Sequence, residues 1–230
     1  MSATLKIIAA GATEGPLHEL VPEFGRQNGI AIEMSFSTAG ALKDRFVGGE
    51  KADVIAVSTP ILEALGKEGR FVPGSIVEFG RASCGVAIRD GFLMPDISTP
   101  EKFKRTLLAA RSVAQTDPAK GGTSGLYFVK LMERMGIAAE MKDKMKYGNA
   151  GRDVGALVQQ GYAELGDTFT SEFVPIPGVR VVGNFPKEYE FVNGYGGAIP
   201  VGAAVEPAKK LLAFLTGAEG KATFKRYGLE

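Results

Sequence analysis

The chain has 230 residues, enough for one large domain or two small ones with a sizeable buried core. Its 27 basic and 26 acidic residues nearly balance and form no basic block, which argues against a nucleic-acid or membrane-surface partner. The single cysteine, Cys84, excludes an internal disulfide and a cysteine-based metal site, and the single histidine, His18, leaves little scope for histidine catalysis. We therefore expect neither a metal nor a cofactor.

The N-terminal residues bear on the cellular location of the protein. No apolar run is long enough for a transmembrane helix, and no signal-peptide pattern precedes the first strand at Thr4-Leu5-Lys6. The protein is expected in the periplasm if a signal peptide has been removed from its N-terminus, and otherwise in the cytoplasm. The sequence leaves both locations open.

The first part of the chain alternates short apolar strands with helices. The expected strands are Leu5–Ala10, Ile30–Phe36 and Ala52–Val57, and each is followed by small or hydroxyl-bearing residues and then a helix. Three successive units of this kind imply a parallel sheet with right-handed crossovers. A ligand site is then expected beyond the carboxyl ends of the strands.

Two longer strands interrupt the alternation. Ile76–Ile88 is long enough to leave one lobe and enter another, and the glycine-rich stretch Val192–Ile199 suits the return. We therefore expect an α/β protein of two lobes. Lobe one should comprise residues 1–80 plus 197–230, and lobe two the inserted segment 81–196.

The stretch from Ser112 to Gly136 carries the strongest local signal. A strand is followed by the loop Pro118–Gly122, and Thr123-Ser124-Gly125 then opens a helix that Gly136 ends. The free N–H groups and the dipole of a helix start favour an anion, and glycine lets a ligand approach the backbone. The alternative is that Thr123 or Ser124 is only a helix cap. Because the chain repeats this arrangement after other strands, we favour an anion site.

Several segments together resemble the bacterial type II periplasmic solute-binding proteins, and most of all the molybdate-binding branch of ABC importers. They are Ile7–Gly11, Phe36–Gly40, Lys51–Ile55 and Asp117-Pro118. The resemblance runs the length of the chain. It implies a two-lobed fold with two crossing strands as a hinge, a small anion bound between the lobes, and no catalytic residue. It also implies a monomer that delivers its ligand to a membrane permease if it is exported.

The resemblance also carries over ligand-binding positions, all at strand ends or helix starts. In lobe one they are Gly11, Ala12, Ser37, Thr38 and Ala39, with Thr59 nearby. In lobe two they are Thr123, Ser124 and Gly125, then Asn149–Gly151, and then Thr170 and Ser171.

The chain departs from the molybdate-binding pattern in two ways. Gly11-Ala12 stands where molybdate binders usually carry two serines, and two arginines, Arg81 and Arg152, occur where such binders rely on neutral donors. A guanidinium in a cleft suits a carboxylate better than a spherical oxyanion. Alternatively, Arg81 pairs with Glu78 and Arg152 points into solvent. Some relatives of this branch resemble aconitate isomerases, so a di- or tricarboxylate is a rival ligand.

Three functions remain open on the sequence. The leading hypothesis is a solute-binding protein of an ABC importer, and the alternative is an isomerase that moves a proton along an unsaturated tricarboxylate. That reaction needs a positioned base, for which Glu172, Asp117 and Asp153 are the candidates, although an Asp before Pro118 is more typical of a turn. A third use of this fold, as the effector domain of a transcription regulator, is disfavoured because no helix-turn-helix segment is present.

Overall fold

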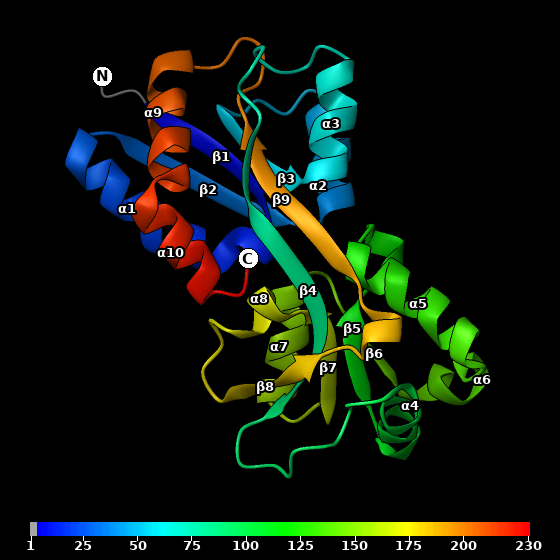
Figure 1. Cartoon of the computed structure of the whole chain (residues 1–230). Coiled ribbons are helices and arrows are strands. Elements are labelled where there is room, and N and C mark those ends of the chain that lie inside the picture. The colour runs from blue at the N-terminus through cyan, green and yellow to red at the C-terminus, as the bar shows by residue number, and fades with distance from the viewer. Residues whose placement is uncertain (1–3) are drawn as a thin grey trace. The chain divides into compact units, whose positions relative to one another are not determined.

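The computed structural model describes residues 4–230, and its contacts divide the chain into two compact units (Figure 1). Unit 1 consists of the residues up to Ala82 together with Asn193–Glu230, and unit 2 is Ser83–Val192. Both boundaries fall inside strands, so the chain passes between the units through β4 (Val77–Arg89) and β9 (Val192–Ala198).

Unit 1 contains a sheet in the order β2-β1-β3-β9. Strand β1 is parallel to β2 and β3, whereas β9 is antiparallel to β3. The strands and helices of this unit are β1 (Thr4–Ala10), α1 (Glu14–Asn28), β2 (Ala31–Ser37), α2 (Ala39–Val47), β3 (Val54–Ser58), α3 (Thr59–Lys67), α9 (Val205–Thr216) and α10 (Ala218–Arg226). The three predicted strand–helix repeats and their parallel pairing are confirmed.

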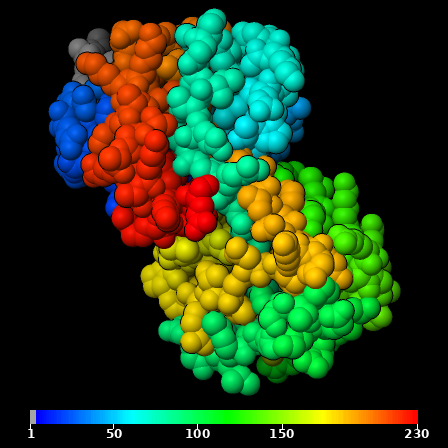
Figure 2. Space-filling model, viewed as in Figure 1, coloured from blue at the N-terminus to red at the C-terminus, as the bar shows by residue number. Residues whose placement is uncertain are grey.

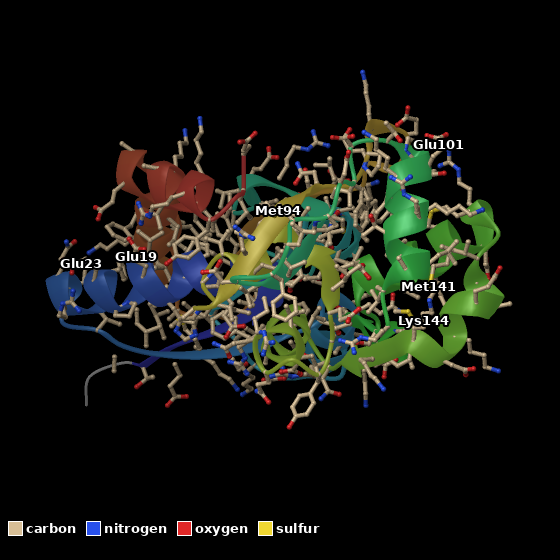
Figure 3. All side chains as sticks on the ribbon, turned by 90° about the horizontal axis from the view of Figure 1, so that it is seen from below. Glu19, Glu23, Met94, Glu101, Met141 and Lys144 are labelled. Atoms are coloured by element: carbon tan, nitrogen blue, oxygen red, sulfur yellow. The ribbon has the colours of Figure 1, made fainter. Side chains whose placement is uncertain are left out.

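Helices α1, α9 and α10 pack together in unit 1, where they appear in blue, orange and red (Figures 1 and 2). The ring of Phe24 on α1 lies 5.6 Å from that of Phe214 on α9. Glu19 of α1, labelled in Figure 3, accepts hydrogen bonds from the Arg226 guanidinium and, at 3.2 Å, from the Tyr227 hydroxyl. Helices α9 and α10 are thus held against α1 by an aromatic contact and by hydrogen bonds to the Glu19 carboxylate.

Unit 2 contains strands in the order β4-β7-β5-β6, with β8 paired to β4. Strand β5 is parallel to β6 and β7, and β4 is antiparallel to β7. The strands and helices of this unit are α4 (Pro100–Ala109), β5 (Val113–Thr116), α5 (Thr123–Met135), α6 (Ala138–Met141), β6 (Met145–Gly148), α7 (Gly151–Gln159), β7 (Leu165–Phe169), α8 (Thr170–Phe173) and β8 (Val179–Asn184).

The ends of helices α4 and α5 in unit 2 are set by residues close to them in the sequence. Helix α5 begins at Thr123 and stops at Gly136, as predicted, and Gly136 has the left-handed φ of 67° that is typical of a glycine cap. Thr99 is the cap of α4, because its hydroxyl accepts the Lys102 N–H. Lys144, labelled in Figure 3, donates to the Leu108 carbonyl at the end of α4 at 2.5 Å.

Candidate functional site

In unit 1 the carboxyl ends of three strands meet at one edge of the sheet. Strands β1 and β2 are in register up to the pair Ala10–Ser37, and β3 runs parallel beside β1. The predicted positions at this edge are Gly11, Ala12, Ser37, Thr38, Ala39 and Thr59. The parallel sheet therefore brings the unit 1 positions to a single edge, as expected from the strand pattern.

Two threonines at this edge have different environments. The Thr38 hydroxyl accepts the Ala41 N–H at 3.3 Å and so caps α2. The Thr59 hydroxyl is buried and has no hydrogen-bond partner among residues 4–230. It faces Gly194 of β9, where a Cβ would lie only 2.6 Å from the hydroxyl oxygen. A buried hydroxyl without a partner is costly, so Thr59 stands out at this edge.

In unit 2 the carboxyl ends of β5, β6 and β7 form the equivalent edge. Strand β5 is in register with β6 from Val113–Met145 to Thr116–Gly148, and β7 lies on its other side. Helices α5, α7 and α8 each begin just beyond these ends. The edge carries all the predicted lobe-two positions, namely Thr123, Ser124, Gly125, Asn149–Gly151, Arg152, Thr170 and Ser171.

The start of α5 lies directly on the end of β5. A Cβ at Gly125 would overlap the Thr116 carbonyl oxygen, and one at Gly122 would overlap the Thr116 side chain. These glycines therefore allow the helix to pack on its own strand. The cap residue of α5 is Gly122 and no side chain caps the helix, so the alternative in which Thr123 or Ser124 serves only as a cap is wrong.

A buried polar cluster lies beneath this helix start. The Ser124 hydroxyl is 3.0 Å from that of Thr168 on β7 and 3.3 Å from that of Thr116 on β5. The Thr116 and Thr168 hydroxyls are 3.5 Å apart. Thr168 in turn donates a hydrogen bond to the Glu172 carboxylate. All four side chains are buried, which gives a carboxylate and three hydroxyls in mutual contact.

The Glu172 carboxylate also lies at the start of α7. A Cβ at Gly151, the first residue of that helix, would overlap the carboxylate carbon and both its oxygens. A helix start favours negative charge through its dipole and its unpaired N–H groups. The protein therefore places one of its own carboxyl groups at a helix start where the sequence predicts a ligand.

The other two candidate bases have structural hydrogen bonds. The Asp117 carboxylate accepts the Ala119 N–H at 2.9 Å and so forms the turn that an Asp before proline predicts. The Asp153 carboxylate accepts the Asn149 N–H at 3.0 Å, at the entry to α7. Of the three acids, Glu172 is the one in contact with the hydroxyl cluster.

Both arginines are exposed. Neither Arg81 nor Glu78 forms an ion pair within residues 4–230, so the alternative in which Arg81 pairs with Glu78 is wrong. The backbone of Arg81 is anchored, because its N–H donates to the Glu230 carbonyl at 2.7 Å and its carbonyl accepts from Glu230 at 3.0 Å. Arg152 lies in the first turn of α7 and is exposed, and this residue has an interaction partner.

Three further buried polar groups in unit 2 have no hydrogen-bond partner among residues 4–230: Gln115, Asp167 and Ser171. Gln115 and Asp167 are register partners on adjacent strands. Burial raises the pKa of Asp167 well above its usual range. Burial, together with the nearby acids Asp167 and Glu172, likewise raises the pKa of the Cys84 thiol, which makes this thiol a poor nucleophile.

Two other kinds of functional feature are absent from residues 4–230. No group of three or more His, Cys, Asp or Glu side chains is arranged to hold a metal ion there. None of the helices in that range combines the length and apolarity needed to cross a bilayer.

The fold of this chain matches solved structures of periplasmic binding proteins over nearly its whole length. The periplasmic molybdate-binding protein of Azotobacter vinelandii aligns with a TM-score of 0.79 at 19% identity, covering 98% of each chain. The mixed α/β fold of the type II periplasmic binding proteins, expected from the sequence, is thus confirmed.

Comparison of amino-acid sequences assigns the chain to a family. Residues 5–230 match the family described as bacterial extracellular solute-binding protein, and the chain belongs to that family. It is 30% identical to an aconitate isomerase of Pseudomonas sp., over 99% of this chain and 87% of the relative. It is 23% identical to the molybdate-binding protein ModA of Escherichia coli K12, over 97% of this chain and 88% of that protein.

The sequence pattern missed two members of the polar cluster, Thr116 and Thr168. A signal was present, because both strands place polar residues in otherwise apolar runs, Gln115-Thr116 in β5 and Asp167-Thr168 in β7. Such residues are costly to bury without partners. Polar pairs near the carboxyl ends of buried strands therefore mark positions to include in a predicted site.

Proposed function

We propose that this protein is an isomerase of the aconitate isomerase type, with Glu172 as the base. The observation that carries the proposal is the buried Glu172 carboxylate, which touches the start of α7 and the hydroxyl cluster of Ser124 and Thr168. The 30% identity to an aconitate isomerase over nearly the whole chain supports the same assignment.

The reaction requires one base and no oxidant. Aconitate carries a methylene arm and a vinyl arm on the same carbon, so a base that removes a methylene proton leaves an allylic carbanion. Returning the proton to the former vinyl carbon moves the double bond to the other arm. The product is again aconitate, and its double bond can have the opposite geometry. Glu172 would take the proton in the first step and give it back in the second.

The donor groups that the chain leaves available support a polycarboxylate substrate. Arg81 is exposed and without an ion pair among residues 4–230, and a planar guanidinium binds a carboxylate through two parallel hydrogen bonds. In unit 2, the predicted donors at the start of α5, Thr123, Ser124 and Gly125, have free backbone N–H groups, which also suit a carboxylate. A buried carboxylate can serve as a proton acceptor, a role that isomerisation requires and that the binding of an oxyanion such as molybdate does not.

A second candidate is a solute-binding protein of an ABC importer that binds a small anion, either an oxyanion or a di- or tricarboxylate. Membership of the solute-binding family favours it. In that case the protein is exported to the periplasm, binds its ligand as a monomer without a cofactor, and delivers it to a membrane permease. The ligand positions would then be those at the two sheet edges, including Thr38, Thr59 and Ser171.

One experiment separates the two candidates. The protein is incubated with one aconitate isomer in D₂O, and proton NMR follows the other isomer and the loss of methylene protons. An isomerase forms the second isomer and incorporates deuterium, whereas a binding protein does neither. Glu172→Gln should abolish both signals. Asp117→Asn is the matched control and should retain them, because the Asp117 carboxylate is used in a turn.

A further inference from the structure

The cluster of Thr116, Ser124, Thr168 and Glu172 has a hydrogen-bond direction that can be worked out by counting protons. Each hydroxyl has one hydrogen to donate and can accept, whereas an ionised carboxylate can only accept. Thr168 uses its hydrogen on the Glu172 carboxylate. Toward Ser124, at 3.0 Å, Thr168 can therefore only accept.

The same count of hydroxyl hydrogens can be applied to Ser124 and its contact with Thr116. If Ser124 donates to Thr168, it can only accept from Thr116, and its distance of 3.3 Å to Thr116 is shorter than the 3.5 Å between Thr116 and Thr168. With Glu172 ionised, the hydrogens therefore run from Thr116 through Ser124 and Thr168 to the carboxylate. The chain of hydroxyls links β5, α5 and β7 to one acid, and every member is at least nine-tenths buried. Water can therefore do little to replace a missing donor.

Protonation of Glu172 reverses this direction. A neutral carboxyl group donates to Thr168, which is then free to donate to Ser124, and Ser124 to Thr116. The hydroxyls can rotate without any movement of heavy atoms. When Glu172 is protonated, the Thr168 hydroxyl can accept its hydrogen. When Glu172 loses that proton, Thr168 donates to the carboxylate again.

We propose that Thr168 is the positioning residue of Glu172, and that Ser124 and Thr116 complete a reversible hydroxyl chain that supports both protonation states of this acid. The inference rests on the proposed isomerase function. Thr168 need not touch the substrate. It holds the carboxylate against Gly151 in one orientation and supplies a donor to the anion and an acceptor to the acid.

The test compares two substitutions of nearly equal size. Thr168→Val keeps the shape and removes the hydroxyl, whereas Thr168→Ser keeps the hydroxyl. We expect Thr168→Val to lower kcat for aconitate by about 100-fold, the scale on which misplacement of a reacting group acts, with little change in KM. Thr168→Ser should recover most of kcat. Thr106→Val, which removes a hydroxyl bonded to the Asp96 carbonyl in the same unit, should leave kcat unchanged.

Two results would overturn the proposal: an unchanged kcat in Thr168→Val, or equal losses in the Val and Ser variants, which would indicate a purely structural role. A double-mutant cycle of Thr168→Val and Glu172→Gln, measured by denaturant unfolding, does not depend on turnover. We expect the two effects to be non-additive by about tenfold in the unfolding equilibrium constant. Additive effects would reject the contact. If the wild-type protein fails to isomerise aconitate, the proposed function falls, and this cycle alone decides whether Thr168 positions Glu172.

Discussion

The Glu172 carboxylate lies against Gly151 at the first residue of α7, and this contact leaves no room for a side chain at position 151. Gly151→Ala should therefore displace the carboxylate. We expect a stability loss of about 1–3 kcal/mol from overpacking and a fall in kcat of about 100-fold from misplacement of the base, measured by denaturant unfolding and by steady-state kinetics.

The matched control for this substitution is Gly155→Ala in the same helix. A Cβ at Gly155 would meet the end of the Ile176 side chain, which can move, and not the carboxylate. This variant should lose stability yet keep its kcat. Full activity in Gly151→Ala would show that the position of Glu172 does not limit the reaction.

Arg81 offers a test of ligand class. The side chain is exposed and forms no ion pair within the part of the chain that the structure describes, so Arg81→Ala should change the free energy of unfolding by no more than about 0.5 kcal/mol. Binding of a tricarboxylate should weaken by roughly 2–5 kcal/mol, because a charge-assisted contact is lost.

Titration calorimetry with citrate and with molybdate measures the change in binding, and denaturant unfolding measures the change in stability. Molybdate binding should change little in Arg81→Ala, and Arg81→Lys should give an intermediate loss for citrate because it keeps the charge without the planar fork. Equal affinity of wild type and Arg81→Ala for citrate would remove Arg81 from the site.

Asp167 should make the protein less stable as the pH rises. Burial raises its pKa in the folded state, so the folded protein binds more protons than the unfolded chain above the ordinary aspartate pKa of about 3.9. The free energy of unfolding should then fall by up to about 1.4 kcal/mol per pH unit, from this value up to the raised pKa. Asp167→Asn removes this titration and should be more stable than wild type at pH 8.

Urea unfolding of both proteins between pH 4 and pH 8 checks this prediction. The gain from Asp167→Asn should grow with pH and be smallest near pH 4. Asp143→Asn, at an exposed position of the same unit, should show no such trend. A wild-type stability that rises across this range with the same slope as Asp167→Asn would contradict the burial argument.

A panel of anions should identify the ligand class by thermal shift. At about 100 times its dissociation constant, a ligand that binds only the folded state adds about 2.7 kcal/mol, which corresponds to roughly 5–10 °C for a chain of this size. The panel contains molybdate, tungstate, sulfate, phosphate, citrate and both aconitate isomers. We expect the tricarboxylates to give the largest shifts. If none of these anions shifts the melting temperature and a neutral sugar tested beside them does, the anion site is excluded.

Thr38 tests whether the sheet edge of unit 1 contributes to anion binding. Thr38→Ala should cost about 1 kcal/mol of stability, because its hydroxyl caps α2, and it should also reduce the thermal shift given by the active anion. Thr38→Ser keeps the hydroxyl and is the control for the cap. If both variants show the full ligand shift, Thr38 acts only as a cap.

Local chemistry made much of the fold predictable. The helix stops at Gly29 and Gly136 are left-handed caps that few residues other than glycine can form. The strand–helix repeats predicted a parallel sheet, whose carboxyl ends carry the hydroxyl residues such as Thr38 and Thr123. Each of these signals depends on residues close together in the sequence.

The α/β class, the order of strands and helices, and a set of polar residues at strand ends could all be predicted from the amino-acid sequence. The choice of Glu172 over Asp117 and Asp153 as the acid in a buried cluster could not be predicted in this way. That choice depends on packing between distant segments: α7 places Gly151 against Glu172, and strand pairing sets Thr168 beside Ser124 and Thr116. Burial and hydrogen-bond geometry arise from these contacts between segments, and no short stretch of the chain encodes them.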